Sequence, residues 1–146
     1  MTVGARGTPQ LPRPRMQAML LADHAIRDAA SGKATLIGVF NRIVSTEFPL
    51  HYLHSIAVYA RMTDAEGDYP IRLDLLRLDD DQTIGRLEGR AIFGNRLEPQ
   101  ELIFESGPVV FERAGTYEFS LFADGLLVGE ARLTVIQQSQ PQGETP

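Results

Sequence analysis

Short segments of alternating apolar and polar residues recur about every ten to fourteen residues along the chain, with turn-forming residues between them. Successive side chains on a strand point to opposite faces, so each such segment predicts a strand with one buried face and one solvated face. Residues 55–62 show this plainly, because Ile56, Val58, Ala60 and Met62 share one face of the segment. The pattern predicts an all-β fold with antiparallel sheets.

The turn residues between the segments set the bounds of the predicted strands. No long helix is predicted, since the nearest candidate, residues 23–32, has little apolar surface and supports a single helical turn at best. The strands are expected near residues 16–22, 34–40, 52–62, 69–78, 83–93, 100–105, 108–112, 116–123 and 126–136.

The last two predicted strands form a hairpin whose register stays open. A three-residue loop that ends at Gly125 places the apolar residues of both strands on one face, but it sets Glu118 opposite Glu130. The charge pattern favours a register shifted by one pair, in which Glu118 lies opposite Arg132. A β-bulge at residues 126–127 would reconcile the two requirements.

Two apolar residues of this hairpin, Phe122 and Val128, fall on the outer face of the sheet in both registers. The register that the charges favour sets them directly opposite each other. Exposed apolar side chains on a sheet mark a contact surface unless another segment of the chain covers them. Phe122 and Val128 are therefore the candidate interaction residues.

The length and composition predict a single domain that is stable without disulfide bonds. Its 146 residues are enough to bury a sizeable core. Cysteine is absent, which excludes disulfides and thiolate metal sites. The formal net charge of -5 is small and the charges are interspersed, so we expect no broad basic surface for nucleic acid. No cofactor is expected either.

Both ends of the chain are predicted to be disordered. Residues 1–15 and 137–146 hold too little apolar surface to offset the entropy of ordering them. The folded domain is therefore placed at residues 16–136. The apolar run at residues 16–22 is too short for a signal-peptide core or a membrane span. We expect a cytoplasmic protein that does not contact a membrane.

The segment AGTYEFSL, residues 114–121, resembles the start of the penultimate strand in immunoglobulin-like sandwiches. In that fold, a tyrosine that follows a Gly-containing corner hydrogen-bonds back to the backbone, and the matching residue here is Tyr117. The paired cysteines and core tryptophan of antibody domains are missing, so the likeness extends to the architecture alone. The resemblance implies an immunoglobulin-like β-sandwich and no particular activity.

A longer stretch, LLADHAIRDAASGKATLIGVFNRI followed by FPL and AVYARM, resembles an uncharacterised family of small bacterial proteins. In that family an Asp and an Arg follow the first strand, and a Gly-Lys-x-x-Leu-Ile-Gly-Val-Phe segment forms the second. The likeness implies a β-sandwich and assigns no activity. The matching residues are Asp23, Arg27, Gly32, Lys33, Leu36, Ile37, Gly38 and Phe40.

The densest polar cluster consists of Asp23, His24, Arg27 and Asp28 and is the candidate site for a small ligand. A carboxylate beside an imidazole orients a general base, and an arginine binds an anion. Neighbouring strand residues point to opposite faces, however, so Asp23 and His24 do not form a dyad while the strand continues. In the structural alternative, Arg27 pairs with Asp23 or Asp28 and holds a loop across the end of the sandwich.

An acidic turn makes calcium a possible ligand of this candidate site. If the early strands form a meander, Asp64, Glu66 and Asp68 come to the same end of the sandwich as Asp23 and Asp28. Calcium requires several oxygen ligands, which such a group of carboxylates supplies. Acidic residues are also common in turns for conformational reasons alone.

These observations predict a non-catalytic interaction or scaffold module that binds a protein partner or a second copy of itself. The alternative is a small-ligand or calcium-binding domain that uses Asp23, Arg27 and Asp28. No nucleophile lies in a recognisable catalytic motif, so we do not expect an enzyme.

Overall fold

Every regular element in the part of the chain that the computed structural model describes, residues 11–139, is a β-strand. The strands are β1 (Arg15–Arg27), β2 (Ala34–Phe40), β3 (Arg42–Ser45), β4 (Leu50–Tyr52), β5 (Ile56–Thr63), β6 (Gly67–Arg77), β7 (Gln82–Phe93), β8 (Gln100–Ser106), β9 (Val109–Phe111), β10 (Gly115–Ala123) and β11 (Leu126–Gln137). Most lie within a few residues of the predicted strands. β1 is longer than predicted, because it continues to Arg27, halfway into the segment for which the sequence supports one helical turn at best. β3 is too short to show alternation, and no strand is predicted there.

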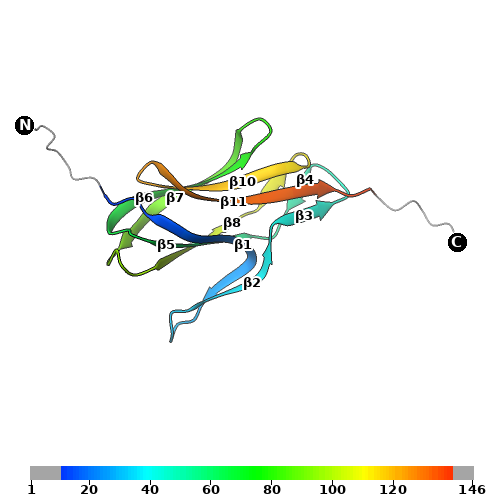
Figure 1. Cartoon of the computed structure of the whole chain (residues 1–146). Helices are drawn as coiled ribbons and strands as arrows, with labels where there is room; N and C mark the ends of the chain where they lie inside the picture. The colour runs from blue at the N-terminus through cyan, green and yellow to red at the C-terminus, as the bar shows by residue number, and fades with distance from the viewer. Residues whose placement is uncertain (1–10, 140–146) are drawn as a thin grey trace, which may run out of the picture.

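The strands form two sheets that pack face to face around one hydrophobic core (Figure 1). The first sheet has the order β2-β1-β5-β8 and the second the order β3-β11-β10-β6-β7, while β4 and β9 pair with each other. The inward positions of β5, which are Ile56, Val58, Ala60 and Met62, are fully buried, as the alternation predicts. The opposite face, predicted to be solvated, is also buried at Ala57 and Tyr59, so that part of the prediction is wrong. The inward residues of β5 join those of β6 and β10 in one apolar cluster.

The connections between the two sheets are those of an immunoglobulin-like Greek key. After β5 the chain crosses to the second sheet for β6 and β7, returns to pair β8 with β5, and crosses again to pair β10 with β6. β3 runs parallel to β11 at the edge of the second sheet. The predicted all-β, immunoglobulin-like sandwich is confirmed.

Tyr117 forms the tyrosine corner that the resemblance implies. Its hydroxyl donates a 2.6 Å hydrogen bond to the backbone carbonyl of Arg113, four residues upstream. The side chain is fully buried, and its ring packs edge-on against Phe111 with 4.9 Å between the ring centroids. This bond fixes the chain where it enters β10 at the end of the core.

The β10–β11 hairpin adopts the register that the charges favour. A two-residue turn at Asp124 and Gly125 joins the strands, and both residues have positive φ, 52° and 79°. Positive φ at both central residues is the geometry of a tight hairpin turn, for which Asp-Gly is a preferred sequence. Glu118 therefore lies opposite Arg132, not opposite Glu130.

A β-bulge follows this turn, but not at residues 126–127 as predicted. Phe122 pairs with Leu127, and the register then shifts so that Val128 is the extra residue. The bulge turns Val128 toward the interior, where it is half-buried and packs against the hydrophobic core. The expected pairing of Phe122 with Val128 on the outer face is therefore wrong, and Leu127 takes the position opposite Phe122.

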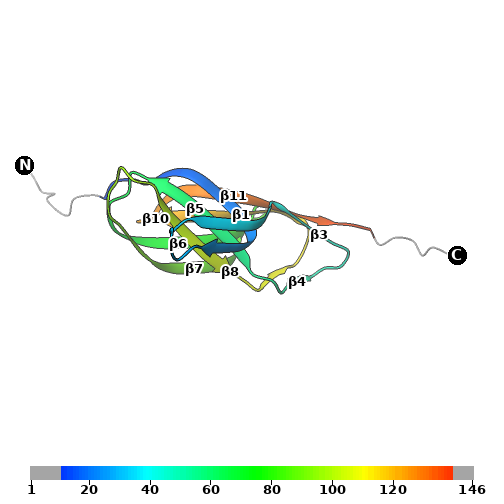
Figure 2. The same ribbon diagram turned by 90° about the horizontal axis from the view of Figure 1, so that it is seen from below.

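The hairpin of β1 and β2 folds back over the outer face of the first sheet (Figures 1 and 2). Through β5, Ala18 lies level with Glu101 of β8, and Arg27 is nine residues further along β1, about 30 Å away in a straight strand. Yet a guanidinium nitrogen of Arg27 lies 3.0 Å from Glu101 Oε1. The hairpin therefore bends sharply, at the point where Asp23 faces Gly38, a residue in the left-handed conformation with φ of 71°.

The ordered chain begins before residue 16. Residues 11–15, predicted to belong to a disordered arm, contact the sandwich: Leu11 packs against the core, and the Pro12 carbonyl accepts a hydrogen bond from the Tyr69 hydroxyl. The predicted boundary is corrected because these contacts supply the apolar burial that composition alone does not show. The rest of the predicted arm, residues 1–10, lies outside the described residues.

At its other end the chain stays paired past residue 136. The backbone N–H of Gln138 donates a 2.8 Å hydrogen bond to the carbonyl of Ser45, which extends the parallel pairing of β11 with β3. The remaining predicted tail, residues 140–146, lies outside the described residues. The chain thus enters the sandwich at one end and leaves it at the opposite end (Figure 1).

Candidate functional site

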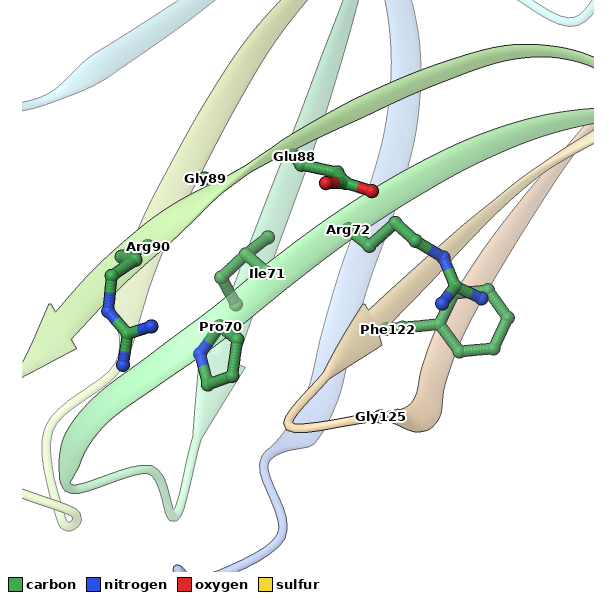
Figure 3. Close-up of a pocket in the computed structure, with 8 residues that line it drawn as sticks. All are labelled: Pro70, Ile71, Arg72, Glu88, Gly89, Arg90, Phe122 and Gly125. Atoms are coloured by element: carbon green, nitrogen blue, oxygen red, sulfur yellow. The ribbon is translucent and has the colours of Figure 1, made fainter.

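Phe122 lies on the outer face of the second sheet, close to the turn that joins β10 to β11 (Figure 3). Arg72 of β6 covers its ring, with the central guanidinium carbon 4.1 Å from the ring centroid. The face of an aromatic ring attracts a cation at this distance. Phe122 is half-buried as a result, and its predicted position on the outer face is confirmed.

A hollow of about 490 Å³ adjoins this stacked pair. Glu88 and Arg90 of β7 form its other side, so one aromatic ring is bordered by charges of both signs. Aromatic residues and arginine are enriched at protein–protein interfaces, whereas glutamate is depleted there. We call this hollow the Phe122 groove; it is lined by Pro70, Ile71, Arg72, Glu88, Gly89, Arg90, Phe122 and Gly125.

Two buried carboxylates on the outer face of the second sheet fix the positions of three arginines. Asp74 is only 3% exposed, and it accepts hydrogen bonds from Arg86 at 2.7 and 3.1 Å and from Arg72 at 3.2 Å. Glu118, 7% exposed, accepts a 3.1 Å hydrogen bond from Arg132. Charge-assisted bonds of this kind fix geometry as well as adding energy. The outer face of the second sheet therefore presents guanidinium groups in defined places.

The folded-back hairpin carries a second apolar surface. Ile26 of β1 lies on the same face as Ile37 and Val39 of β2, and Leu20 continues the same alternation along β1. The exposed fractions of these four side chains run from 40% for Leu20 to 56% for Val39. We call these four residues the hairpin stripe. This surface is not predicted from the sequence, because the first strand is expected to end at residue 22, whereas the alternation continues through Ile26.

The structure does not bring Asp23, Arg27 and Asp28 together. Arg27 pairs with Glu101, in place of the predicted pairing with Asp23 or Asp28. The Asp28 carboxylate accepts a 2.7 Å hydrogen bond from the backbone N–H of Ser31, which holds the pKa of Asp28 below its usual range. Asp28 thus stabilises the hairpin turn, as acidic residues in turns commonly do.

Asp23 has a structural position at the bend of the hairpin. Its carboxylate lies directly over Gly38, where a β-carbon on residue 38 would collide with it. It also lines a hollow of about 450 Å³ together with Tyr52 and His54. Burial, and then the charge of Asp23, raises the pKa of Tyr52. A glycine at position 38 therefore permits both the left-handed backbone and the close approach of Asp23.

The acidic turn at residues 64–68 lies far from Asp23. Arg15 pairs with Thr63 at that end of the sandwich, and Asp23 is eight residues further along β1. The expected meeting of the turn with Asp23 is therefore wrong, because β1 pairs antiparallel with β5 along its first half. Within residues 11–139, no three His, Cys, Asp or Glu side chains gather closely enough to hold a metal ion.

Glu101 holds the folded-back hairpin to the first sheet. Its carboxylate accepts a hydrogen bond from the Tyr59 hydroxyl and one of 3.0 Å from Arg27, and Arg61 lies 3.6 Å away. The bond from Tyr59, and then that from Arg27, holds the pKa of Glu101 below its usual range, against the opposing effect of burial. The ionised carboxylate therefore stabilises the closed hairpin.

Replacing Glu101 by glutamine is expected to lower the free energy of unfolding at pH 7 by about 1 kcal/mol, because the charge that attracts Arg27 is lost. A carboxylate whose pKa is lowered by folding stabilises the fold above its unfolded pKa and loses this effect as the pH falls through the folded pKa. The difference between wild type and Glu101→Gln should therefore shrink between about pH 5 and pH 3. Urea unfolding of both proteins at pH 7 and at about pH 3 measures this difference in the free energy of unfolding. A difference that is the same at both pH values would contradict the role of the ionised Glu101 carboxylate.

Comparison with known proteins places this sandwich in a family. The sequence matches the family of unknown function DUF6941 over residues 17–136. The chain belongs to this family. No curated protein matches the DUF6941 chain. Among solved structures, an immunoglobulin-like protein from Pseudomonas aeruginosa matches 90% of this chain and 99% of its own length, with 15% sequence identity and a TM-score of 0.40.

Among the residues described, no helix has both the length and the hydrophobicity that crossing a bilayer requires.

Proposed function

We propose that this domain is a non-catalytic interaction or scaffold module that binds a protein partner through the hairpin stripe. One observation supports this most: Ile26, Ile37 and Val39 are about half exposed on one face of the hairpin of β1 and β2. Single exposed apolar residues are common on protein surfaces, but neighbouring ones mark contact sites. β2 also lies at the edge of the first sheet, where no other described strand pairs with its outer side, so it offers backbone groups to a partner strand.

The Phe122 groove supplies a second contact face, on the outside of the other sheet. Phe122 and Leu127 lie opposite each other there, and Leu127 is 40% exposed. Leu127 takes the role that the sequence analysis gives to Val128, whose side chain packs against the core. A domain with one contact face on each sheet suits a scaffold that holds two partners at once.

Affinity capture from the native cell extract tests this function, with three tagged variants compared at matched concentration. Ile37→Lys is expected to reduce a protein retained at the hairpin stripe at least tenfold, because a charge replaces an apolar anchor. Phe122→Asp is expected to reduce a protein retained at the groove while leaving the fold intact, since the ring is only half-buried. Quantitative mass spectrometry of the retained proteins measures both effects.

Leu53→Asp is the matched control, because Leu53 is 77% exposed in the loop before β5 and belongs to neither face. It should retain every partner of the wild type. Circular dichroism and urea unfolding of each variant establish that the sandwich stays folded. If both Ile37→Lys and Phe122→Asp retain all the proteins that the wild type retains, the proposal is overturned.

A further inference from the structure

We propose that the free edge of β7 pairs antiparallel with β7 of a second copy of this chain, so that two second sheets join into one continuous sheet. β7 lies at the edge of the sheet next to β6, and its other side has no partner in the described chain. It is one of the longest strands, from Gln82 to Phe93. A long unpaired edge presents a row of backbone N–H and C=O groups that can pair with another strand.

The middle of β7 is exposed on both faces. All five residues 86–90 are exposed, including Leu87, which points to the inner face and is still 39% exposed. A cleft of about 290 Å³ lies beneath it, between β7 and β8, and Ala91, Leu102 and Phe104 contribute to its apolar lining. The first sheet, which ends at β8, therefore does not fully cover the inner face of β7.

The charges along β7 select one pairing register. In a two-fold arrangement centred on Gly89, Glu88 of each copy lies opposite Arg90 of the other on the outer face. Opposite charges on directly facing residues stabilise an antiparallel pair. On the inner face the same register sets Leu87 opposite Ala91, and both of these residues line the cleft. A two-fold dimer requires one surface that is complementary to itself, and the edge of β7 around Gly89 meets this requirement.

Neighbouring registers fit less well. Centring the pairing on Glu88 sets Glu88 against itself and Arg86 against Arg90, and like charges facing each other are destabilising. Centring it on Leu87 would use Arg86 as the partner of Glu88. Arg86 already holds the buried Asp74 with two hydrogen bonds, however, and the β-bulge at the start of β7 would fall inside that pairing.

Arg90 is the freer cation. Its pair with Asp68 joins two side chains that are 60% and 54% exposed, and exposed pairs of this kind contribute little. Arg90 can therefore turn toward a second copy at small cost. The alternating charges of β7 also place like charges opposite each other in other registers. They therefore favour the Gly89-centred pairing and disfavour the alternatives.

Sedimentation equilibrium of the full chain from about 1 to 100 µM tests the dimer. The wild type is expected to approach twice the 16.2 kDa of one chain as its concentration rises. Glu88→Arg and Arg90→Glu, each alone, should shift the dissociation constant at least tenfold toward monomer, because each places like charges opposite each other.

Two further samples make the test specific to the register. An equimolar mixture of the two single variants should form a heterodimer, since each reversed charge then faces its opposite. The double variant Glu88→Arg/Arg90→Glu should dimerise like the wild type for the same reason. A control, Leu53→Asp, should not change the association, because Leu53 is an exposed residue of the loop before β5 and is not part of β7.

Three results would overturn the proposal. If the wild type stays monomeric over the whole concentration range, a second copy does not pair with the edge of β7. That edge would then pair with a strand or peptide of another protein, if with any. A dimer that survives Arg90→Glu excludes the Gly89-centred register. Failure of the mixed single variants to associate, with both shown to be folded by circular dichroism, excludes the charge pairing itself.

Discussion

Replacing Tyr117 by alanine is expected to lower the free energy of unfolding by about 3–5 kcal/mol, the largest effect that we predict for this chain. The side chain is fully buried, packs edge-on against Phe111, and donates the 2.6 Å bond to the carbonyl of Arg113. Alanine removes the ring from the core and leaves that carbonyl without its donor. Urea unfolding followed by far-ultraviolet circular dichroism measures the change.

Tyr117→Phe separates the two contributions. It keeps the ring and removes only the hydrogen bond, so about 1–2 kcal/mol should be lost. Tyr52→Phe is the matched control, because the Tyr52 hydroxyl has no hydrogen-bond partner among the described residues, and a change below about 0.5 kcal/mol is expected. Equal stability of wild type and Tyr117→Phe would show that water replaces the corner bond without loss.

Gly129→Val is expected to have the second largest effect, a loss of about 2–3 kcal/mol. Gly129 faces β1, and a β-carbon there would collide with Met16 Cε and would lie 3.1 Å from Met16 Cγ and 3.3 Å from Met19 Sδ. Both distances are tighter than ordinary contact, so valine forces the two methionines out of place. Gly129→Ala adds one carbon and should cost about 1 kcal/mol. The unfolding midpoint in urea measures both changes.

A double-mutant cycle tests whether Met16 is the cause. The loss due to Gly129→Val should be smaller when Met16 is already alanine, because the space that valine needs is then free. Gly94→Ala is the control, since a β-carbon at residue 94 meets no atom within 4 Å. If the loss is equal in both backgrounds, the strain arises elsewhere than at Met16.

Local rules account for most of the sandwich. The alternation of apolar residues predicts the positions of most strands, and the segment around Tyr117 predicts the corner bond, because both depend on residues close together in the chain. The sequence leaves the register of the last hairpin open, and the structure adopts the alternative that sets Glu118 opposite Arg132 across an Asp-Gly turn. The strand positions and the corner bond need no knowledge of distant parts of the chain.

Two features could not be predicted because they depend on distant contacts. The fold-back of the first hairpin is held by Arg27 and Glu101, which are 74 residues apart in the chain. The bulge at Val128 depends on whether its side chain finds space in the core, and the spacing of strand residues does not contain this information. The candidate surfaces changed accordingly: the hairpin stripe appeared, and Leu127 replaced Val128 beside Phe122.

The two ends of the described chain lie at opposite ends of the sandwich, and this arrangement has a mechanical consequence (Figure 1). A pulling force applied through Leu11 and Ser139 acts along β1 and β11, parallel to the strands. β11 is hydrogen-bonded to β10 on one side and to β3 on the other. Because ladder bonds run across the strands, the force loads many of them together instead of opening them one after another. The sandwich is therefore expected to resist stretching in this direction more than a pull that opens the ladder bonds one at a time.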